Sequence, residues 1–498
     1  MRKIHIVAFL FAVFGLSSCN DWLDVRPETE QKEKDQFSTY EGFCCALTGL
    51  YMTLGDHVIY GERLSMSNIE SLANLWYLSD QTSRQEDYYL MQHDYSNVAY
   101  SQTAIQAIYA KLFYAIAQAN VIIKNINERG NVISNPAIRA TIQGEAYGIR
   151  AYLQLDVLRL FGQVPGGSRQ VSLPYSETTS IDEMPPYYTF DEYVEKLKYD
   201  IDKAKSLLKD NDPASEYSFS ELNSYDSPVD DYMSYRQSRM NYWAVKALEA
   251  RMYRYIGDET MAYRTAKEVI DATLDGQPVM ALSGTADFES GYKLCPNECL
   301  FYLSKYDVMD YSQKFLIGGS SNQYNRATCL AITHEMYQEL FQDVLPESNN
   351  RTNCWRDNTQ DNSGNLMAAS MKYYWDVDNV KNAMLYYQLI PMLRMSELYL
   401  IAMESTTELT EANNLFQTYM LSHNVPNLPG FASAEELEAF IINEYRREFY
   451  VEGQMFYTYK RQNSTSMLWS DKPVSETDYI LPLPTTEYNP NNQHTKAL

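Results

Sequence analysis

The stretch between residues 72 and 97 places large aromatic rings among short polar side chains. Its sequence, LANLWYLSDQTSRQEDYYLMQHDYSN, contains Trp76, Tyr77, Tyr88, Tyr89 and Tyr95. Rings that are held rigidly at a surface can stack on the apolar faces of sugars, while nearby amide, carboxylate and guanidinium groups bond the hydroxyls. The pattern therefore indicates a non-covalent binding surface. Packing is the alternative, because large aromatic side chains are usually mostly buried.

The strongest candidates in this stretch surround one tryptophan. Trp76 and Tyr77 lie beside Asn74, Asp80, Gln81 and Arg84, which could bond a polar ligand. We predict that the ligand is bound by Asn74, Trp76, Tyr77 and Arg84. For Trp76 the sequence leaves binding and packing open, and for Tyr88 and Tyr89 it favours packing.

A second candidate is Trp355, in the polar segment SNNRTNCWRDNTQDNSGN. Cys354 is its only apolar neighbour within three residues, so local packing does not explain the ring. We predict a ligand-binding role for Trp355.

Further along, Tyr373, Tyr374 and Trp375 alternate as in a short strand, which favours packing over binding. Trp243 shares a helical face with alanines and is predicted to lie in the core.

Catalytic chemistry finds little support in the sequence. The histidines form no recognisable nucleophile–base arrangement, and the G-x-S-x-G, H-E-x-x-H and phosphate-binding glycine-loop motifs are absent. Acidic pairs that could resemble a glycosidase dyad are expected by chance among 65 Asp and Glu residues. The segment RREFYVEG, residues 446–453, alternates charged and apolar side chains and predicts a structural network of ion pairs. We therefore expect no enzyme, no metal and no other cofactor.

The first twenty residues, MRKIHIVAFLFAVFGLSSCN, are typical of a secretory signal. A basic start precedes an apolar run over residues 4–16 that is too short to span a membrane. Leu16-Ser17-Ser18-Cys19 resembles the bacterial lipobox, so Cys19 is predicted to be acylated and to become the mature N-terminus. An ordinary signal peptide with an unrelated cysteine is the alternative. Acyl chains on Cys19 would anchor the protein stably to a membrane.

The charge balance limits the classes of partner. With 41 basic and 65 acidic side chains the net charge is 41 − 65 = −24, which makes nucleic acid a poor partner, and we expect none.

Six cysteines follow Cys19, an even number that permits disulfides in an exported protein. A chain of this length can bury its own core without them, so we predict buried thiols at Cys44 and Cys45.

Helical periodicity dominates the rest of the chain. Residues 240–273, MNYWAVKALEARMYRYIGDETMAYRTAKEVIDAT, predict two helices joined by a Gly-Asp turn, and alanines on the facing sides allow close approach. This unit has about the length of a tetratricopeptide repeat. Residues 391–423 follow the same plan. The sequence predicts a mostly α fold built on tetratricopeptide-like helical hairpins, with few short strands, of which residues 299–307 are the best candidate. Long irregular insertions are expected at about 165–190, 212–236, 280–330 and 345–380.

Taken in order, the motifs resemble the SusD/RagB family of nutrient-binding outer-membrane lipoproteins of the Bacteroidetes. The resemblance covers essentially the whole mature chain. It is carried by SCNDWLDVRP, YAKLFYAIAQANVIIKNI, GEAYGIRAYLQLDVLRLFGQVP, NECLFYLSKYD, LIPMLRMSELYLIAMES, NEYRREFYVEGQMFYTYKRQ and YILPLPTTEYNP. The order of Arg446-Arg447-Glu448-Phe449, then Glu452-Gly453, then Leu481-Pro482-Leu483-Pro484 is specific.

The resemblance implies an architecture, a location and a role. Residues 1–18 would be the lipoprotein signal peptide and residues 19–498 a single SusD-like helical domain. The protein would lie at the outer cell surface, as a hinged lid over a SusC-like TonB-dependent transporter. It would bind a nutrient glycan and deliver it to that transporter without a chemical step. A peptide cargo on the same fold, or a scaffold that binds only protein, is the alternative.

Overall fold

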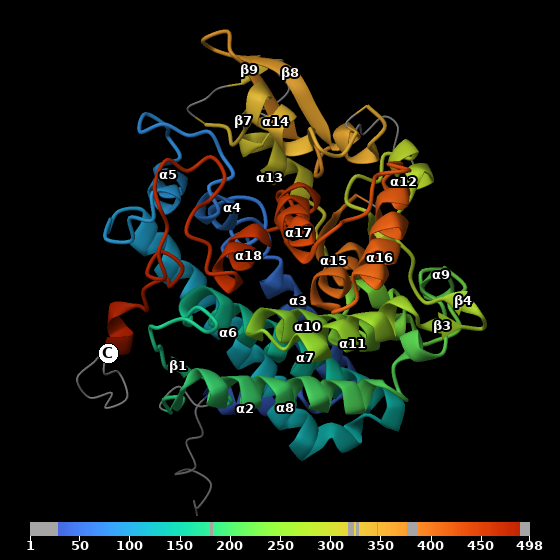
Figure 1. Ribbon diagram of the computed structural model, residues 1–498. Helices are drawn as coiled ribbons and strands as arrows, with labels where there is room; N and C mark the ends of the chain where they lie inside the picture. The colour runs from blue at the N-terminus through green and yellow to red at the C-terminus, as the bar shows by residue number, and fades with distance from the viewer. Residues whose placement is uncertain are drawn as a thin grey trace, which may run out of the picture.

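The computed structural model describes residues 28–179, 183–316, 323–324, 328–345, 347–375 and 387–488, and Figure 1 labels its elements. The signal peptide and the acylated Cys19 that the sequence predicts lie outside the described residues. The described chain is mostly helical with few short strands, which confirms the predicted fold class. No helix in these ranges combines the length and apolar character needed to cross a membrane.

The helices of the described ranges differ widely in length, and the longest two, α6 and α7, are neighbours in sequence. Their bounds are α2 Glu28–Gln36, α3 Tyr40–Leu54, α4 Asn68–Leu72, α5 Gln85–Met91, α6 Ser101–Arg129, α7 Pro136–Phe161, α8 Phe190–Leu208, α9 Phe219–Leu222, α10 Tyr242–Ile256, α11 Glu259–Ile270, α12 Thr285–Glu289, α13 Val308–Phe315, α14 His334–Phe341, α15 Met395–Ser405, α16 Leu409–Ser422, α17 Ala434–Glu448 and α18 Met455–Arg461.

The long helices pack in successive pairs, as hairpin repeats require. Helices α6, α7 and α8 pack on one another in sequence order, and α10, α11, α15 and α16 continue the stack (Figure 1). The predicted hairpin over residues 240–273 is confirmed as α10 and α11. Gly257 ends α10 with φ of +82°, a left-handed conformation that favours glycine. The second predicted hairpin is confirmed as α15 and α16.

The strands are short and lie outside the helical stack. Their bounds are β1 Leu173–Pro174, β2 Tyr187–Tyr188, β3 Thr273–Leu274, β4 Gln277–Pro278, β5 Cys299–Ser304, β6 Gln323–Tyr324, β7 Ile332–Thr333, β8 Trp355–Asp361, β9 Leu366–Ser370 and β10 Leu389–Arg394. The predicted strand at 299–307 is confirmed as β5, which pairs antiparallel with β10.

The largest sheet lies at the top of the molecule in Figure 1. Its strand order is β6-β8-β9-β7, and helices α13 and α14 lie directly below it. This part of the chain falls largely within the insertions predicted at 280–330 and 345–380. It contains Trp355, the first residue of β8.

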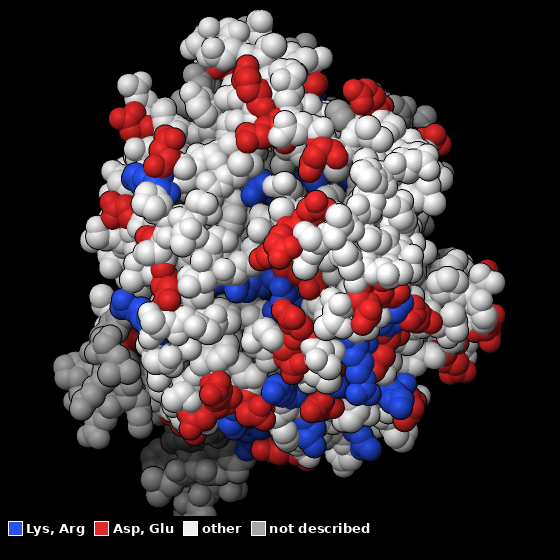
Figure 2. Space-filling view, in the orientation of Figure 1, with Lys and Arg blue, Asp and Glu red and all other residues white. Residues whose placement is uncertain are grey.

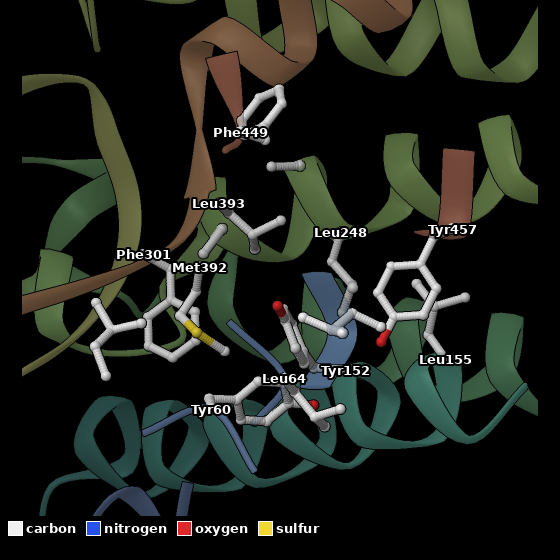
Figure 3. Close-up of a cluster of buried hydrophobic side chains, with 14 of the residues drawn as sticks. Tyr60, Leu64, Tyr152, Leu155, Leu248, Phe301, Met392, Leu393, Phe449 and Tyr457 are labelled. Carbon is white, nitrogen blue, oxygen red and sulfur yellow. The ribbon is translucent and has the colours of Figure 1, made fainter. Parts of the chain in front are cut away.

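The core joins the helical stack to the β5–β10 ribbon. Figure 3 shows side chains from α7, α10, α18 and both strands meeting in one cluster, with Tyr152, Leu248, Phe301, Leu393 and Tyr457 among them. Trp243, predicted as core, packs against this core but stays partly exposed at its edge, where its Nε1 donates to Ala214 O at 2.9 Å.

Buried charges lie between α17 and the strands, as the RREFYVEG segment predicts. Glu448 accepts from Arg351 Nη1 at 3.0 Å and from Arg394 Nη1 at 2.8 Å. Glu452 accepts from Lys372 Nζ at 2.6 Å, and Arg447 pairs with Glu444. The predicted structural ion-pair network is therefore confirmed. Because each charge is buried with partners, removing one partner would leave the other uncompensated.

The six cysteines at positions 44, 45, 295, 299, 329 and 354 are free thiols. The last four are buried. Cys44 is half-buried and Cys45 is exposed, so the expectation of burial at Cys45 is wrong. Consecutive residues on a surface helix point about 100° apart, and α3 turns Phe43 and Leu47 inward instead.

Candidate ligand-binding site

Two of the predicted site residues, far apart in sequence, meet at one tyrosine. The ring of Trp355 lies 4.6 Å from that of Tyr450, and the ring of Trp76 lies 5.3 Å from it in an edge-to-face arrangement. Both distances are typical of favourable aromatic pairs. The structure therefore brings Trp76 and Trp355 together through Tyr450, a residue that sequence reasoning had placed in the ion-pair segment and not in the site.

A tight turn fixes the position of Tyr450. The tyrosine hydroxyl donates to Leu75 O at 2.6 Å, beside Trp76. The backbone N–H groups of Val451 and Gly453 donate to the Glu70 carboxylate at 3.1 and 2.8 Å. Gly453 has φ of +74°, and a Cβ at this position would lie 2.3 Å from Leu64 O. Helix α4, which carries Glu70, and the turn after α17 are thus joined by contacts that only glycine permits.

The Glu70 carboxyl is buried, and this burial raises its pKa to about 8. The two backbone donors and the nearby Lys372 ammonium oppose the shift, and Glu452 adds to it. Near neutral pH the carboxyl therefore holds its proton for most of the time. A neutral carboxyl in this turn adds no charge beneath the aromatic rings.

Three aromatic side chains reach the surface around α14. Trp355 is partly exposed and its ring also lies 5.5 Å from that of Tyr337. Trp469 is partly exposed and donates from Nε1 to Glu339 Oε2 at 2.8 Å. Tyr77 is 46% exposed, and its backbone N–H donates to Ala331 O, just before β7 and α14. We call Tyr77, Trp355 and Trp469 the aromatic surface.

The other predicted site residues are engaged inside the protein. Trp76 is only 3% exposed, so its ring fits the packing alternative and not a surface platform. Asn74 is buried, and its Nδ2 donates to Met91 O at 3.1 Å. Arg84 pairs with Asp87 at 2.6 Å, and its guanidinium lies over the Phe315 ring. These three residues support the loop from which Tyr77 projects.

A second aromatic group is formed by Tyr292, Tyr374, Trp375 and Tyr387. The Tyr387 ring lies 5.5 Å from that of Tyr292 and 5.7 Å from that of Trp375. The short strand predicted over residues 373–375 is wrong, because Tyr374 follows a turn in which its N–H bonds Met371 O. The turn buries Tyr373 and Trp375 and leaves Tyr374 half-buried.

The surface around these groups suits a polar ligand. Figure 2 shows that charged side chains gather over α8, α10 and α11, whereas the upper part, over β8, β9 and α14, carries only scattered charges, mostly acidic, among uncharged side chains. Aromatic rings with adjacent amide and carboxylate groups can stack and hydrogen-bond a ligand without reacting with it.

Among the described residues, one histidine–carboxylate cluster has metal-like spacing. His423, Glu444 and Glu448 offer ligand atoms within 4.8 Å of one another, and all three are buried. Arg351 already donates to both carboxylates, and burial lowers the pKa of His423 to about 3. Because Arg394 and Arg447 also pair with these carboxylates, a divalent cation would add uncompensated positive charge. The cluster therefore fits the ion-pair network and not a metal site.

Comparison with known proteins gives a consistent set of similarities. Residues 21–225 match a SusD-like family model described as "Starch-binding associating with outer membrane". A SusD-like protein P25 from Formosa agariphila is 22% identical over 167 residues, which cover 33% of this chain and 31% of that protein. The matched region thus spans about a third of that relative's length.

Solved structures are similar over most of the chain. A SusD superfamily protein from Bacteroides vulgatus has a TM-score of 0.69 and 18% identity, covering 90% of this chain and 96% of its own. A second, from Bacteroides thetaiotaomicron, has a TM-score of 0.67 and 19% identity, covering 91% and 98%. The surface glycan-binding protein A from Bacteroides fluxus has a TM-score of 0.64 and 17% identity, covering 93% and 98%. At these identities the likeness shows a shared fold.

Proposed function

We propose, since the chain is a SusD/RagB family protein, that it is a surface lipoprotein that binds a nutrient glycan and delivers it to a SusC-like TonB-dependent transporter. Acylation at Cys19 would anchor it to the outer membrane, and residues 19–498 would act as one domain without catalysis. The similarity to the surface glycan-binding protein from Bacteroides fluxus and to the starch-binding family supports a carbohydrate cargo.

The observation that carries the proposal is the partly exposed ring of Trp355. One side of the indole is packed against Tyr450 and Tyr337, so the ring is held in place before a ligand arrives. A rigid, preformed platform binds with little loss of conformational entropy. Tyr77 and Trp469 lie around the same helix, α14, and would contact further sugar units of an extended chain.

Affinity electrophoresis of the mature chain in gels that contain single polysaccharides tests the proposal, with Cys19→Ser to prevent acylation. We expect retardation in at least one gel. Trp355→Ala should weaken binding by about tenfold, since an aromatic stacking contact contributes roughly 0.5–1.5 kcal/mol beyond the area it buries. Tyr114→Ala is the matched control, because Tyr114 is 57% exposed on α6, away from β8 and α14.

Two outcomes would contradict the proposal. Retardation by peptide mixtures alone would move the cargo to the peptide alternative, and retardation by nothing would favour the protein-only scaffold. Because Trp355 packs against Tyr450, the melting temperature of the Ala variant must be measured alongside. A Trp355→Phe variant, which keeps a ring in the same contact, should retain most of the affinity if stacking is the cause.

A further inference from the structure

Two basic side chains approach the same tyrosine ring in the second aromatic group. Lys293 Nζ lies 5.8 Å from the Tyr374 ring centroid, and the Arg356 guanidinium carbon lies 5.9 Å from it. Lys293 comes from the loop after α12, whereas Arg356 is the second residue of β8. All three side chains are partly exposed. The pair is therefore accessible from solvent and is assembled from separate segments of the chain.

Neither base has a carboxylate partner among the residues that the structure describes. Lys293 Nζ donates to one acceptor, Tyr374 O, at 3.0 Å, and Arg356 forms no ion pair there. Two other half-buried bases do have such partners: Arg63 pairs with Glu86 at 3.0 Å and Lys305 with Asp307 at 2.9 Å. In a chain with 65 acidic and 41 basic side chains, an adjacent pair of bases without an acid is therefore conspicuous.

The two cations oppose each other electrostatically. Burial lowers the pKa of Lys293, and the charge of Arg356 lowers it further. Two like charges in a partly desolvated position are unfavourable until an anion lies between them. A bound carboxylate or sulfate would accept charge-assisted hydrogen bonds from both side chains, and the guanidinium fork matches such groups in a bidentate manner.

The surrounding rings indicate what carries the anion. Tyr292, Tyr374 and Tyr387 are partly exposed, and the Tyr374 ring lies beside both bases. Tyr387 contacts Tyr292, which precedes Lys293 in sequence, and Trp375, which follows Tyr374. A pyranose ring with an attached anionic group needs an aromatic face for the ring and a cation for the substituent. A free inorganic anion would need only the cations.

We propose that Lys293, Arg356 and the Tyr374 ring form a subsite for an anionic sugar unit, so that the cargo is a glycan carrying carboxylate or sulfate groups. This inference rests on the proposed glycan-binding function and specifies its substrate class. Uronic-acid units and sulfated units share the chemistry that the subsite recognises, and binding measurements distinguish them.

Isothermal titration of the mature Cys19→Ser chain tests the subsite with three probes. These are oligogalacturonate, oligosaccharides of chondroitin sulfate, and a neutral galacto-oligosaccharide of similar length. We expect at least one anionic probe to bind more tightly than the neutral one. Lys293→Gln and Arg356→Gln should each weaken that binding by about 10- to 100-fold, the range for a lost charge-assisted hydrogen bond. Affinity for the neutral probe should change little.

Two further variants serve as controls. Lys203→Gln is the matched control, because Lys203 Nζ also lies over a tyrosine ring, that of Tyr199 at 5.4 Å, on the surface of α8. It should leave every affinity unchanged. Lys293→Arg retains the charge and should retain the preference for the anionic probe, which separates loss of charge from a local folding defect.

The results separate failure of the subsite from failure of the proposed function. Equal affinity for neutral and anionic probes, unchanged in Lys293→Gln and Arg356→Gln, overturns the anionic subsite but leaves glycan binding in place. Absence of binding to all three probes and to the polysaccharide gels overturns both. Binding of inorganic sulfate as tightly as of the sulfated oligosaccharide also overturns the subsite, because it would show that the aromatic rings contribute nothing.

Discussion

Replacing Gly453 with alanine tests whether the turn after α17 positions the aromatic residues. Two costs add at this position. A left-handed backbone is unfavourable by roughly 1–2 kcal/mol for a residue with a Cβ. In addition, the new Cβ would lie 2.3 Å from Leu64 O and 3.0 Å from Ile69 Cγ2, and overpacking of this kind costs about 1–3 kcal/mol. We expect Gly453→Ala to lower the free energy of unfolding by about 2–5 kcal/mol.

Gly257 provides a matched control for the backbone term. Its φ is +82°, close to the +74° of Gly453, but a Cβ there would meet no atom within 4 Å. Gly257→Ala should therefore lose only about 1–2 kcal/mol. The difference between the two variants isolates the close approach of the turn to α4.

Urea denaturation followed by tryptophan fluorescence measures both variants, and polysaccharide gels measure binding. Gly453→Ala should also weaken the binding that depends on Trp355, because Tyr450 supports that ring, whereas Gly257→Ala should not. Equal losses of stability in the two variants would refute the reasoning, since they would show that the turn relaxes away from Leu64 without cost.

Two pH-dependent predictions follow from buried carboxyl groups. Burial alone would raise the pKa of Glu404, but the charges of Arg461 and Arg254 outweigh burial and lower the pKa from 4.5 to about 2. The stabilisation is therefore present above pH 4.5 and is lost as the pH falls toward 2. This shift in pKa corresponds to roughly 3 kcal/mol of folding free energy. Glu404→Gln should lower stability at pH 7 and flatten the acid side of the curve, measured as the free energy of unfolding against pH. Glu70 has the opposite sign: its pKa of about 8 means that stability is greatest below pH 4.5 and falls as the pH rises through 8. Glu70→Gln should remove this loss, measured by thermal unfolding between about pH 4.5 and 8, and an unchanged profile would show that the carboxyl is ionised in the folded protein.

The helical scaffold was predictable because its signals are local. Alanines at helical spacing and the Gly-Asp turn at 257–258 are contained within the segment that they define, and α10 and α11 follow them. The β8–β9 hairpin was not predictable, since the polar run NTQDNSGN shows no alternation of apolar residues. Its turn depends on Gly364 at φ of +82° and on N–H groups that bond Asp361.

The site was predictable only in part, for the same physical reason. Composition identified Trp76 and Trp355 as unusual rings, but their exposure depends on contacts with Tyr450, which is distant in sequence from both. Nothing in the local sequence distinguishes Trp76, whose ring is buried, from Trp355, whose ring reaches solvent. Lys293 and Arg356 were missed because their lack of an acidic partner among the described residues is a property of the folded chain.

The position of Arg351 has a consequence for how this protein could diversify. Arg351 lies one turn of chain before Trp355 and is paired with Glu444 and Glu448 of α17, so the segment is anchored at its base. The β8–β9 hairpin beyond it extends away from the scaffold (Figure 1). Loops of other length or sequence could replace the hairpin while the anchor keeps its ion pairs. If Trp355 binds the cargo as proposed, exchange of this hairpin would change the cargo preference and leave the stability of the helical repeats intact.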